Sequence, residues 1–193
     1  MKRYIFGVIF IILLTLGMLL FFVDGPKPQT QKDTKVEDNQ KQTKSLTDYA
    51  SSNTSRVVLT EQGEIVGDDS YKSIRITVSR DRRLVEVLDS YSLRVEKSQE
   101  FPNSQVAYET FLHALDKAGY TNSQGDTKSD ERGVCPTGNR YVYEVVDGTE
   151  QVQRTWSTSC SAKHGTYAGT SITKQLFSNQ ITDYRKFVSD VRL

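Results

Sequence analysis

One short stretch holds most of the residues that could carry out chemistry. Residues 154–169, RTWSTSCSAKHGTYAG, contain the single tryptophan, Trp156, one of the two cysteines, Cys160, and one of the two histidines, His164. A cysteine beside a histidine is the arrangement of a thiolate nucleophile with its base. The same two side chains could instead supply half of a metal site, or Cys160 could belong to the pinned end of a hairpin. The elements around the stretch decide among these hypotheses.

A β-hairpin is predicted around Asp147-Gly148, which stands between the alternating runs 139–146 and 149–159. Asp-Gly is a strong hairpin signal because a type I′ turn needs positive φ at both central residues. With a two-residue loop, the register places Cys135 opposite Cys160 in a non-hydrogen-bonded pair, where Cα atoms approach to about 4.5 Å. That separation lies at the short end of the disulfide range. We therefore predict a Cys135–Cys160 disulfide, which leaves no thiolate for catalysis.

The same register divides the hairpin side chains between two faces of the sheet. Tyr141 is expected opposite Arg154. The face that carries both cysteines is expected to be apolar and to hold Tyr141, Tyr143, Val145, Val152 and Trp156. A bulge at Pro136 or Gly138 would shift this register.

A second motif, Ser171-Ile-Thr-Lys174, places a serine one helical turn before a lysine. This Ser-x-x-Lys pattern occurs in penicillin-recognising enzymes, but the Ser-Asp-Asn and Lys-Thr-Gly elements of those enzymes are absent from the sequence. A helix N-cap at Thr170 or Ser171 explains the serine without catalysis. We therefore expect no catalytic residues. The alternative is a small envelope hydrolase that uses either Cys160 with His164 or Ser171 with Lys174.

No metal or cofactor is expected. His113 falls on the polar face of a predicted helix, four residues after Glu109, which fits a solvated i,i+4 contact better than a proton-transfer pair. The cysteines and histidines lack the tight Cys-x-x-Cys or His-x-x-x-His spacing of structural zinc sites. The acidic pairs Asp68-Asp69 and Asp130-Glu131 are expected to be solvated.

Residues 56–193 predict an extracytoplasmic α+β domain, an antiparallel sheet packed against about three helices. Strict alternation in 73–79 puts its three apolar residues on one face, as in a half-buried strand. The predicted strands are 56–60, 64–66, 73–79, 83–88, 91–97, 139–146 and 149–159. A first helix is expected between an N-cap at Asn103 and a C-terminal cap at Gly119. Its apolar stripe is Ala107, Phe111, Ala114, Leu115 and Ala118.

The last part of the domain predicts two further helices, at 171–177 and within 182–191. Their spacing is helical rather than alternating, and Asn179 separates them. The residues expected to be buried are Ile172 and Leu176 in the first helix, and Tyr184, Phe187, Val188 and Val191 in the second.

Residues 4–23, YIFGVIFIILLTLGMLLFFV, are predicted to cross a membrane as a single helix. The run has no charged residue and is long enough for a hydrocarbon core of about 30 Å. A cleaved signal peptide is the alternative, but its apolar region is shorter and ends in small residues, whereas this run ends Leu-Leu-Phe-Phe-Val. Lys2 and Arg3 precede the span. The positive-inside bias therefore predicts a signal anchor with residues 1–3 in the cytoplasm and everything after Val23 outside.

Residues 24–55 predict a flexible, disordered linker, because they are polar and contain few residues that could be buried. Its five lysines and five acidic residues cancel, and its average span is roughly 30 Å. The domain that follows holds 18 Lys and Arg against 19 Asp and Glu, a net charge of about −1. This balance lacks the basic excess of a nucleic-acid-binding domain.

Several segments together resemble a known group of proteins. The segments are Ile74–Ser79, Cys135–Tyr141, Trp156–Cys160, Leu176-Phe177 and Gln180–Tyr184. The sequence resembles uncharacterised single-span membrane-anchored proteins of Saccharibacteria and related small-genome bacteria. The resemblance implies a bacterial cell-envelope protein and supplies no catalytic residues. We therefore expect a non-catalytic binding or assembly module, whose partners are the bilayer, through residues 4–23, and an envelope protein or surface ligand.

Overall fold

The computed structural model describes residues 45–123, 130–160, 165–167 and 169–193. The predicted anchor at 4–23 and residues 24–44 of the predicted linker lie outside these ranges. Within the described ranges, no helix has the length and apolar character that a membrane span requires.

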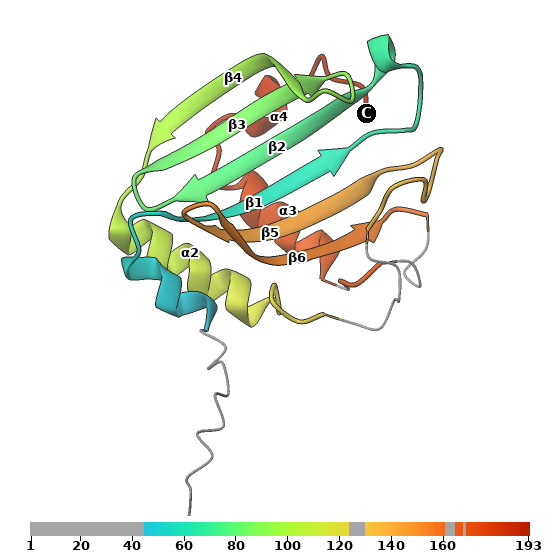
Figure 1. The fold of residues 1–193 in the computed structure, drawn as a ribbon. Helices are drawn as coiled ribbons and strands as arrows, with labels where there is room; N and C mark the ends of the chain where they lie inside the picture. Colours follow the sequence, from blue (N-terminus) through green and yellow to red (C-terminus); the bar gives the residue numbers. More distant parts are fainter. Residues whose placement is uncertain (1–44, 124–129, 161–164, 168) are drawn as a thin grey trace, which may run out of the picture. The chain divides into compact units, whose positions relative to one another are not determined.

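The described residues form the predicted α+β domain, with an antiparallel sheet of six strands in the order β4-β3-β2-β1-β5-β6 (Figure 1). Each strand is antiparallel to its neighbours. The strands are β1 (Ser55–Gln62), β2 (Lys72–Ser79), β3 (Arg82–Asp89), β4 (Arg94–Pro102), β5 (Arg140–Asp147) and β6 (Glu150–Thr158). The entry strand β1 therefore becomes a central strand, paired with both β2 and β5. The predicted strand at 64–66 is absent, because these residues belong to the β1–β2 connection.

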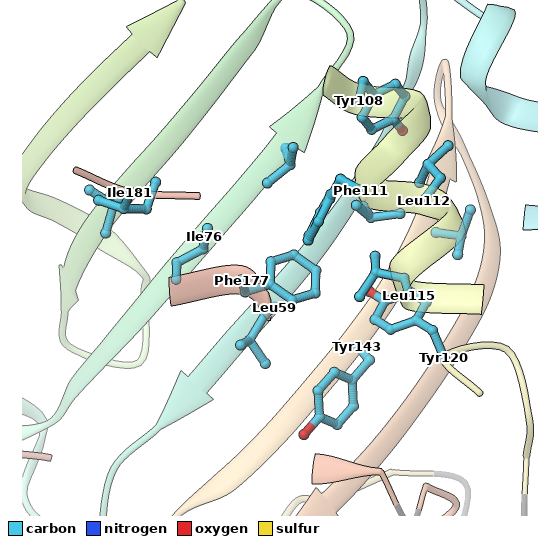
Figure 2. Packing of buried hydrophobic residues seen from close by; sticks show 14 of the residues in the cluster. Leu59, Ile76, Tyr108, Phe111, Leu112, Leu115, Tyr120, Tyr143, Phe177 and Ile181 are labelled. Atoms are coloured by element: carbon cyan, nitrogen blue, oxygen red, sulfur yellow. The ribbon is translucent and has the colours of Figure 1, made fainter. Parts of the chain in front are cut away.

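Three α-helices and a 3₁₀ helix lie on one face of the sheet (Figure 1). The elements outside the sheet are η1 (Leu46–Ser51), η2 (Asp68–Ser70), α2 (Gln105–Lys117), α3 (Thr170–Ser178) and α4 (Tyr184–Phe187). The core fills the space between this layer and the sheet. Figure 2 shows Leu59 and Ile76 of the sheet together with Phe111 of α2 and Phe177 of α3. The rings of Phe111 and Phe177 meet edge to face, with centroids 5.2 Å apart.

Helix α2 begins one residue later than predicted and buries a different stripe. Its N-cap is Ser104, whose hydroxyl accepts a hydrogen bond from the backbone N–H of Ala107 (3.2 Å). Gly119, with φ 73°, ends the helix as predicted, because the N–H of Tyr120 reaches back to the carbonyl of Leu115 (3.0 Å). The buried residues are Tyr108, Phe111, Leu112 and Leu115. The larger side chains thus replace the predicted alanines at the interface with the sheet.

The folded domain starts before residue 56, so the last part of the predicted linker is ordered. Leu46, Tyr49 and Ala50 of η1 are buried against α2. Ser55, already in β1, donates a hydrogen bond to the carbonyl of Tyr49 (2.7 Å). Three apolar residues within one short helix are enough to dock it, although the composition of 24–55 as a whole is polar.

The predicted hairpin forms between β5 and β6, but the predicted register is wrong. Asp147 pairs with Glu150, so the loop is Gly148-Thr149, and a bulge between Val145 and Val146 shifts the pairing again. Beyond the bulge Val142 faces Trp156, and Tyr141 faces Ser157 instead of Arg154. Beyond the bulge the pairing is shifted by an odd number of residues from the predicted register. Each β6 side chain therefore lies on the opposite face, relative to β5, from the one predicted. Trp156 therefore lies on the opposite face of the sheet from Tyr141.

Helix α3 extends one residue beyond the predicted helix at each end, α4 is shorter than predicted, and α3 buries a different face. Helix α3 buries Thr173 and Phe177, whereas Ile172, expected in the core, is exposed. In α4 only the turn Tyr184–Phe187 is helical, and Phe187 is its buried residue. Leu176, Tyr184, Val188 and Val191 pack against the core as partly buried residues.

Candidate functional site

Cys135 and Cys160 form the predicted disulfide, with Cα atoms 5.7 Å apart. The bond is not a ladder pair, because Cys135 lies in the loop before β5 and Cys160 follows β6. Gly138 is required beside it, since a Cβ at this position would lie 2.6 Å from Ser159 Oγ and 2.8 Å from Cys135 Sγ. Cys160 has no thiol with which to act as a nucleophile. His164 lies outside the described residues.

The disulfide holds residues 130–138 over the sheet face that the helices leave uncovered. Val134 and Cys135 form a small buried cluster with Val142 and Trp156. Since strand residues alternate between faces, Val142 and Trp156 point away from the main core. Trp156 retains 1% of its accessible surface. Trp156 thus belongs to a structural cluster, and Cys160 is bonded to Cys135 of the same cluster.

Glu131, expected in a solvated acidic pair, is buried and 3% exposed. Gln62 Nε2 donates to one carboxylate oxygen (3.0 Å), and Arg154 Nη2 donates to the other (2.5 Å). Asp130 remains more exposed, and its hydrogen bonds with Arg132 lower its pKa. Because both oxygens of Glu131 have partners, this carboxylate fastens the loop to β1 and β6.

The Ser-x-x-Lys motif does not assemble a nucleophile and base. Ser171 is exposed at the start of α3, whose N-cap is Gly169. Lys174 instead faces the sheet, where its Nζ donates to Glu61 Oε1 (2.8 Å) and lies 4.5 Å from the centroid of the Tyr141 ring. Burial opposes the charge on Lys174, but the hydrogen bond and charge of Glu61 outweigh it and raise the lysine pKa. A lysine held protonated cannot accept the proton of a serine hydroxyl.

His113 and Glu109 are exposed on α2, on the polar face where they were predicted. Across the described ranges, no group of three His, Cys, Asp or Glu side chains could hold a metal ion. Neither observation provides a catalytic or metal site.

An exposed apolar surface gathers at one end of the sheet, where the β1–β2 connection and the β3–β4 turn lie (Figure 1). Each of its residues keeps between 39% and 48% of its accessible surface. They account for five of the eight large hydrophobic residues that are exposed in the described part of the chain. This end patch consists of Ile65, Val66, Tyr91, Leu93 and Val95. A concentration of this kind is the usual mark of an interaction surface.

Two loops are joined to build the end patch. The Tyr91 ring stacks on Tyr71, with centroids 4.0 Å apart, and its hydroxyl donates to the carbonyl of Val66 (2.9 Å). Asp68 Oδ1 accepts a hydrogen bond from the backbone N–H of Tyr91 (2.8 Å). Ser90 and Leu93 both adopt positive φ, at 58° and 56°. The turn is therefore fixed in a strained shape that presents Tyr91 and Leu93 to solvent.

Acidic groups border the end patch. Glu64, Asp68 and Asp69 have no Lys, Arg or His nitrogen within ion-pair distance among the described residues. Two cations next to the patch are in ion pairs, since Arg94 pairs with Asp89 (2.5 Å) and Lys72 with Glu96. The surroundings of the patch are therefore negative.

The sequence analysis did not identify the end patch. One signal was present, because Ile65-Val66 stands between Gly63 and Gly67, and Tyr91-Ser-Leu93 directly follows Asp89-Ser90. Large apolar residues enclosed by turn-forming residues cannot easily be buried by a regular strand. Assigning 64–66 and 91–97 to strands concealed this signal.

A cleft of about 480 Å³ opens at the same end of the sheet, on the side of the helices. Its charged residues are mostly paired with one another, since Lys97 Nζ lies 3.2 Å from Asp190 and donates to the carbonyl of Phe187 (2.8 Å). The lining residues are Ser70, Lys72, Val87, Glu96, Lys97, Asp190, Val191 and Arg192. This mixture of charges selects no single class of ligand, so the end patch is the stronger candidate site.

Comparisons with known proteins add no functional assignment. The sequence matches no protein family, and no curated protein is significantly similar to it.

Proposed function

We propose that the protein is a non-catalytic binding module of a bacterial cell envelope, held at the outer surface of the membrane by residues 4–23. The uncharged apolar run after Lys2 and Arg3 supports the anchor and its orientation. The Cys135–Cys160 disulfide suits an oxidising compartment outside the cytoplasm. The resemblance to membrane-anchored proteins of Saccharibacteria points the same way.

The observation that carries the binding function is the end patch. Four of its five side chains project from two connections that hydrogen bonds and ring stacking hold in place, and the fifth, Val95, lies at the start of β4. A rigid apolar surface loses little conformational entropy when a partner covers it. The partner we propose is another protein of the envelope, because the patch is an open surface outside the cleft.

The alternative hydrolase lacks support from the geometry. Cys160 is joined to Cys135, and Lys174 is committed to Glu61. Both arrangements remove the reactive form that a nucleophile or base would need. A binding function therefore accounts for the residues better than catalysis does.

The end patch lies at the end of the sheet opposite to the point where the chain enters. Strand β1 starts at Ser55, next to η1, and reaches Gln62 at the patch end. Eight residues of extended strand span about 25 Å.

A photo-crosslinking experiment tests the binding function. A photoreactive amino acid replaces Leu93 in the full chain, and the same replacement at Ile172 serves as the control, because Ile172 is also an exposed apolar residue. Irradiated cells that make the protein should give a discrete adduct from position 93 and none of that size from position 172. The identified protein, purified, should bind the full chain, and Leu93→Ser should weaken this binding. Equal adducts at both positions, or none at either, would contradict the proposal.

Protease treatment of intact cells tests the orientation. With residues after 23 outside, the protease should cleave the chain between residues 24 and 44 without lysis. Protection of the domain until the membrane is opened would place it on the cytoplasmic side and refute the proposed location.

A further inference from the structure

We propose that the end patch docks a basic, apolar protein segment, one that places large hydrophobic side chains on the patch and Lys or Arg around them. This inference rests on the proposed binding function and specifies the chemistry of the partner. It follows from three properties of the same surface, namely its apolar residues, the strain in its turn and the sign of the charges that border it.

The turn between β3 and β4 shows that the exposed side chains are not an accident of folding. Leu93 has φ 56°, a conformation that costs a residue with a Cβ about 1–2 kcal/mol. Glycines hold several positions of similar φ, at 73°, 72° and 60° for Gly119, Gly133 and Gly148, and Ser90, Cys135 and Asp183 are the other non-glycine residues with positive φ among the described residues. At Leu93 the chain accepts the strain and places an isobutyl group where it remains 45% exposed. A leucine in this position is explained by a contact that it makes with another molecule.

The charges around the patch select the partner. Glu64, Asp68 and Asp69 lie in the β1–β2 connection beside Ile65 and Val66, and none of them forms an ion pair within 4 Å among the described residues, although Asp68 interacts electrostatically with Arg94. Complementary charges at the rim of an interface steer the encounter and exclude wrong partners. Three carboxylates outside any ion pair therefore favour a segment with Lys or Arg flanking its apolar residues.

The same charges disfavour the other occupants of an apolar surface. A two-fold dimer through this patch would bring the same acidic border from both copies into one interface, and these like charges would repel one another. An anionic bilayer surface would repel the same carboxylates. Both alternatives remain measurable outcomes.

Binding of a defined probe by the full chain in zwitterionic detergent micelles tests the proposal. The probe is a 12-residue peptide of alternating Lys and Leu, and its counterpart of alternating Glu and Leu is the charge control. We expect the basic peptide to bind at least tenfold more tightly than the acidic one. Its affinity should fall as salt rises, because the rim contacts are screened.

Two matched pairs of variants locate the binding. Leu93→Ser should weaken the basic peptide at least fivefold, whereas Ile172→Ser, at an exposed apolar position on α3, should change its affinity less than twofold. Glu64→Gln with Asp69→Asn should weaken binding and flatten its salt dependence, whereas Glu109→Gln with Asp116→Asn on α2 should do neither. Circular dichroism of each variant establishes that it is folded.

The proposal is overturned if both peptides bind equally, or if the α2 and α3 variants weaken binding as much as the patch variants. It is also overturned if the chain in micelles associates with itself through Leu93, or if the domain binds anionic vesicles more strongly than the basic peptide. Should crosslinking at Leu93 identify a partner with an acidic contact surface, the binding function would stand and only the partner chemistry would be wrong.

Discussion

Removing the disulfide should destabilise the domain and expose Trp156. The bond joins residues 25 positions apart, and in the chain-entropy model a loop of this length contributes about 3.5 kcal/mol to the free energy of unfolding. With a urea m-value of about 2 kcal/mol/M, Cys135→Ser with Cys160→Ser should lower the urea midpoint by roughly 2 M. The loop that covers Trp156 loses its tether in the same step, so local opening should precede global unfolding.

The single tryptophan makes this prediction directly measurable. Trp156 is 1% exposed and packs beside Cys135, so its emission reports on the cluster under the loop, while far-ultraviolet circular dichroism reports on the sheet. Both signals are followed in urea for the full chain in micelles, oxidised and reduced. The double variant is the control, because a reductant should leave it unchanged. A midpoint shift below about 0.5 M, with no red shift of the emission, would refute the view that the disulfide holds this cluster together.

Three further predictions concern other buried groups. Glu131→Ala leaves Arg154 without its carboxylate partner and should lower the free energy of unfolding, measured in urea, by about 2–3 kcal/mol. Glu131→Gln should lower it less. Burial raises the pKa of Tyr108 and Tyr184 to about 12, so the folded values lie above those of the unfolded chain. The stability that these groups support should therefore be complete below pH 10 and fall as the pH rises toward 12, which absorbance at 295 nm and unfolding at each pH can check. Leu46 is buried although it lies in a polar region of the sequence, so Leu46→Ala should lower the free energy of unfolding by about 2–5 kcal/mol. An unchanged urea midpoint would show that η1 contributes nothing to stability.

The sequence predicted features that depend on local patterns. Alternation in 73–79 identified β2, since Ile74, Ile76 and Val78 are all buried. Gly119 ended α2 because only a residue without a Cβ adopts its φ without strain. The disulfide was predicted correctly from a register that is itself wrong. The cysteines meet outside the ladder, because Cys135 lies in the loop before β5 and Cys160 follows the end of β6.

The register could not be predicted because β5 is apolar on both faces. Tyr141 and Tyr143 face the helices, while Val142 and Trp156 face the loop that the disulfide holds. When both faces are buried, alternation no longer distinguishes one register from the next. The covering loop, which creates the second buried face, is itself a tertiary feature. The burial of Glu131 is also a tertiary feature, because its hydrogen-bond partners lie on β1 and β6. The local sequence therefore indicated a solvated acid.

The end patch differs from two other sites of positive φ, because stability alone does not explain it. The cysteine at φ 52° is tied into the disulfide, and Asp183 at φ 54° begins α4, whose Phe187 is buried. Leu93 adopts a similar φ and receives no comparable burial in return. Glycine would avoid the strain, and a polar residue would avoid the exposed apolar surface. Both costs fall at one position, beside Tyr91 and three unpaired carboxylates, and a partner that covers Leu93 would offset both.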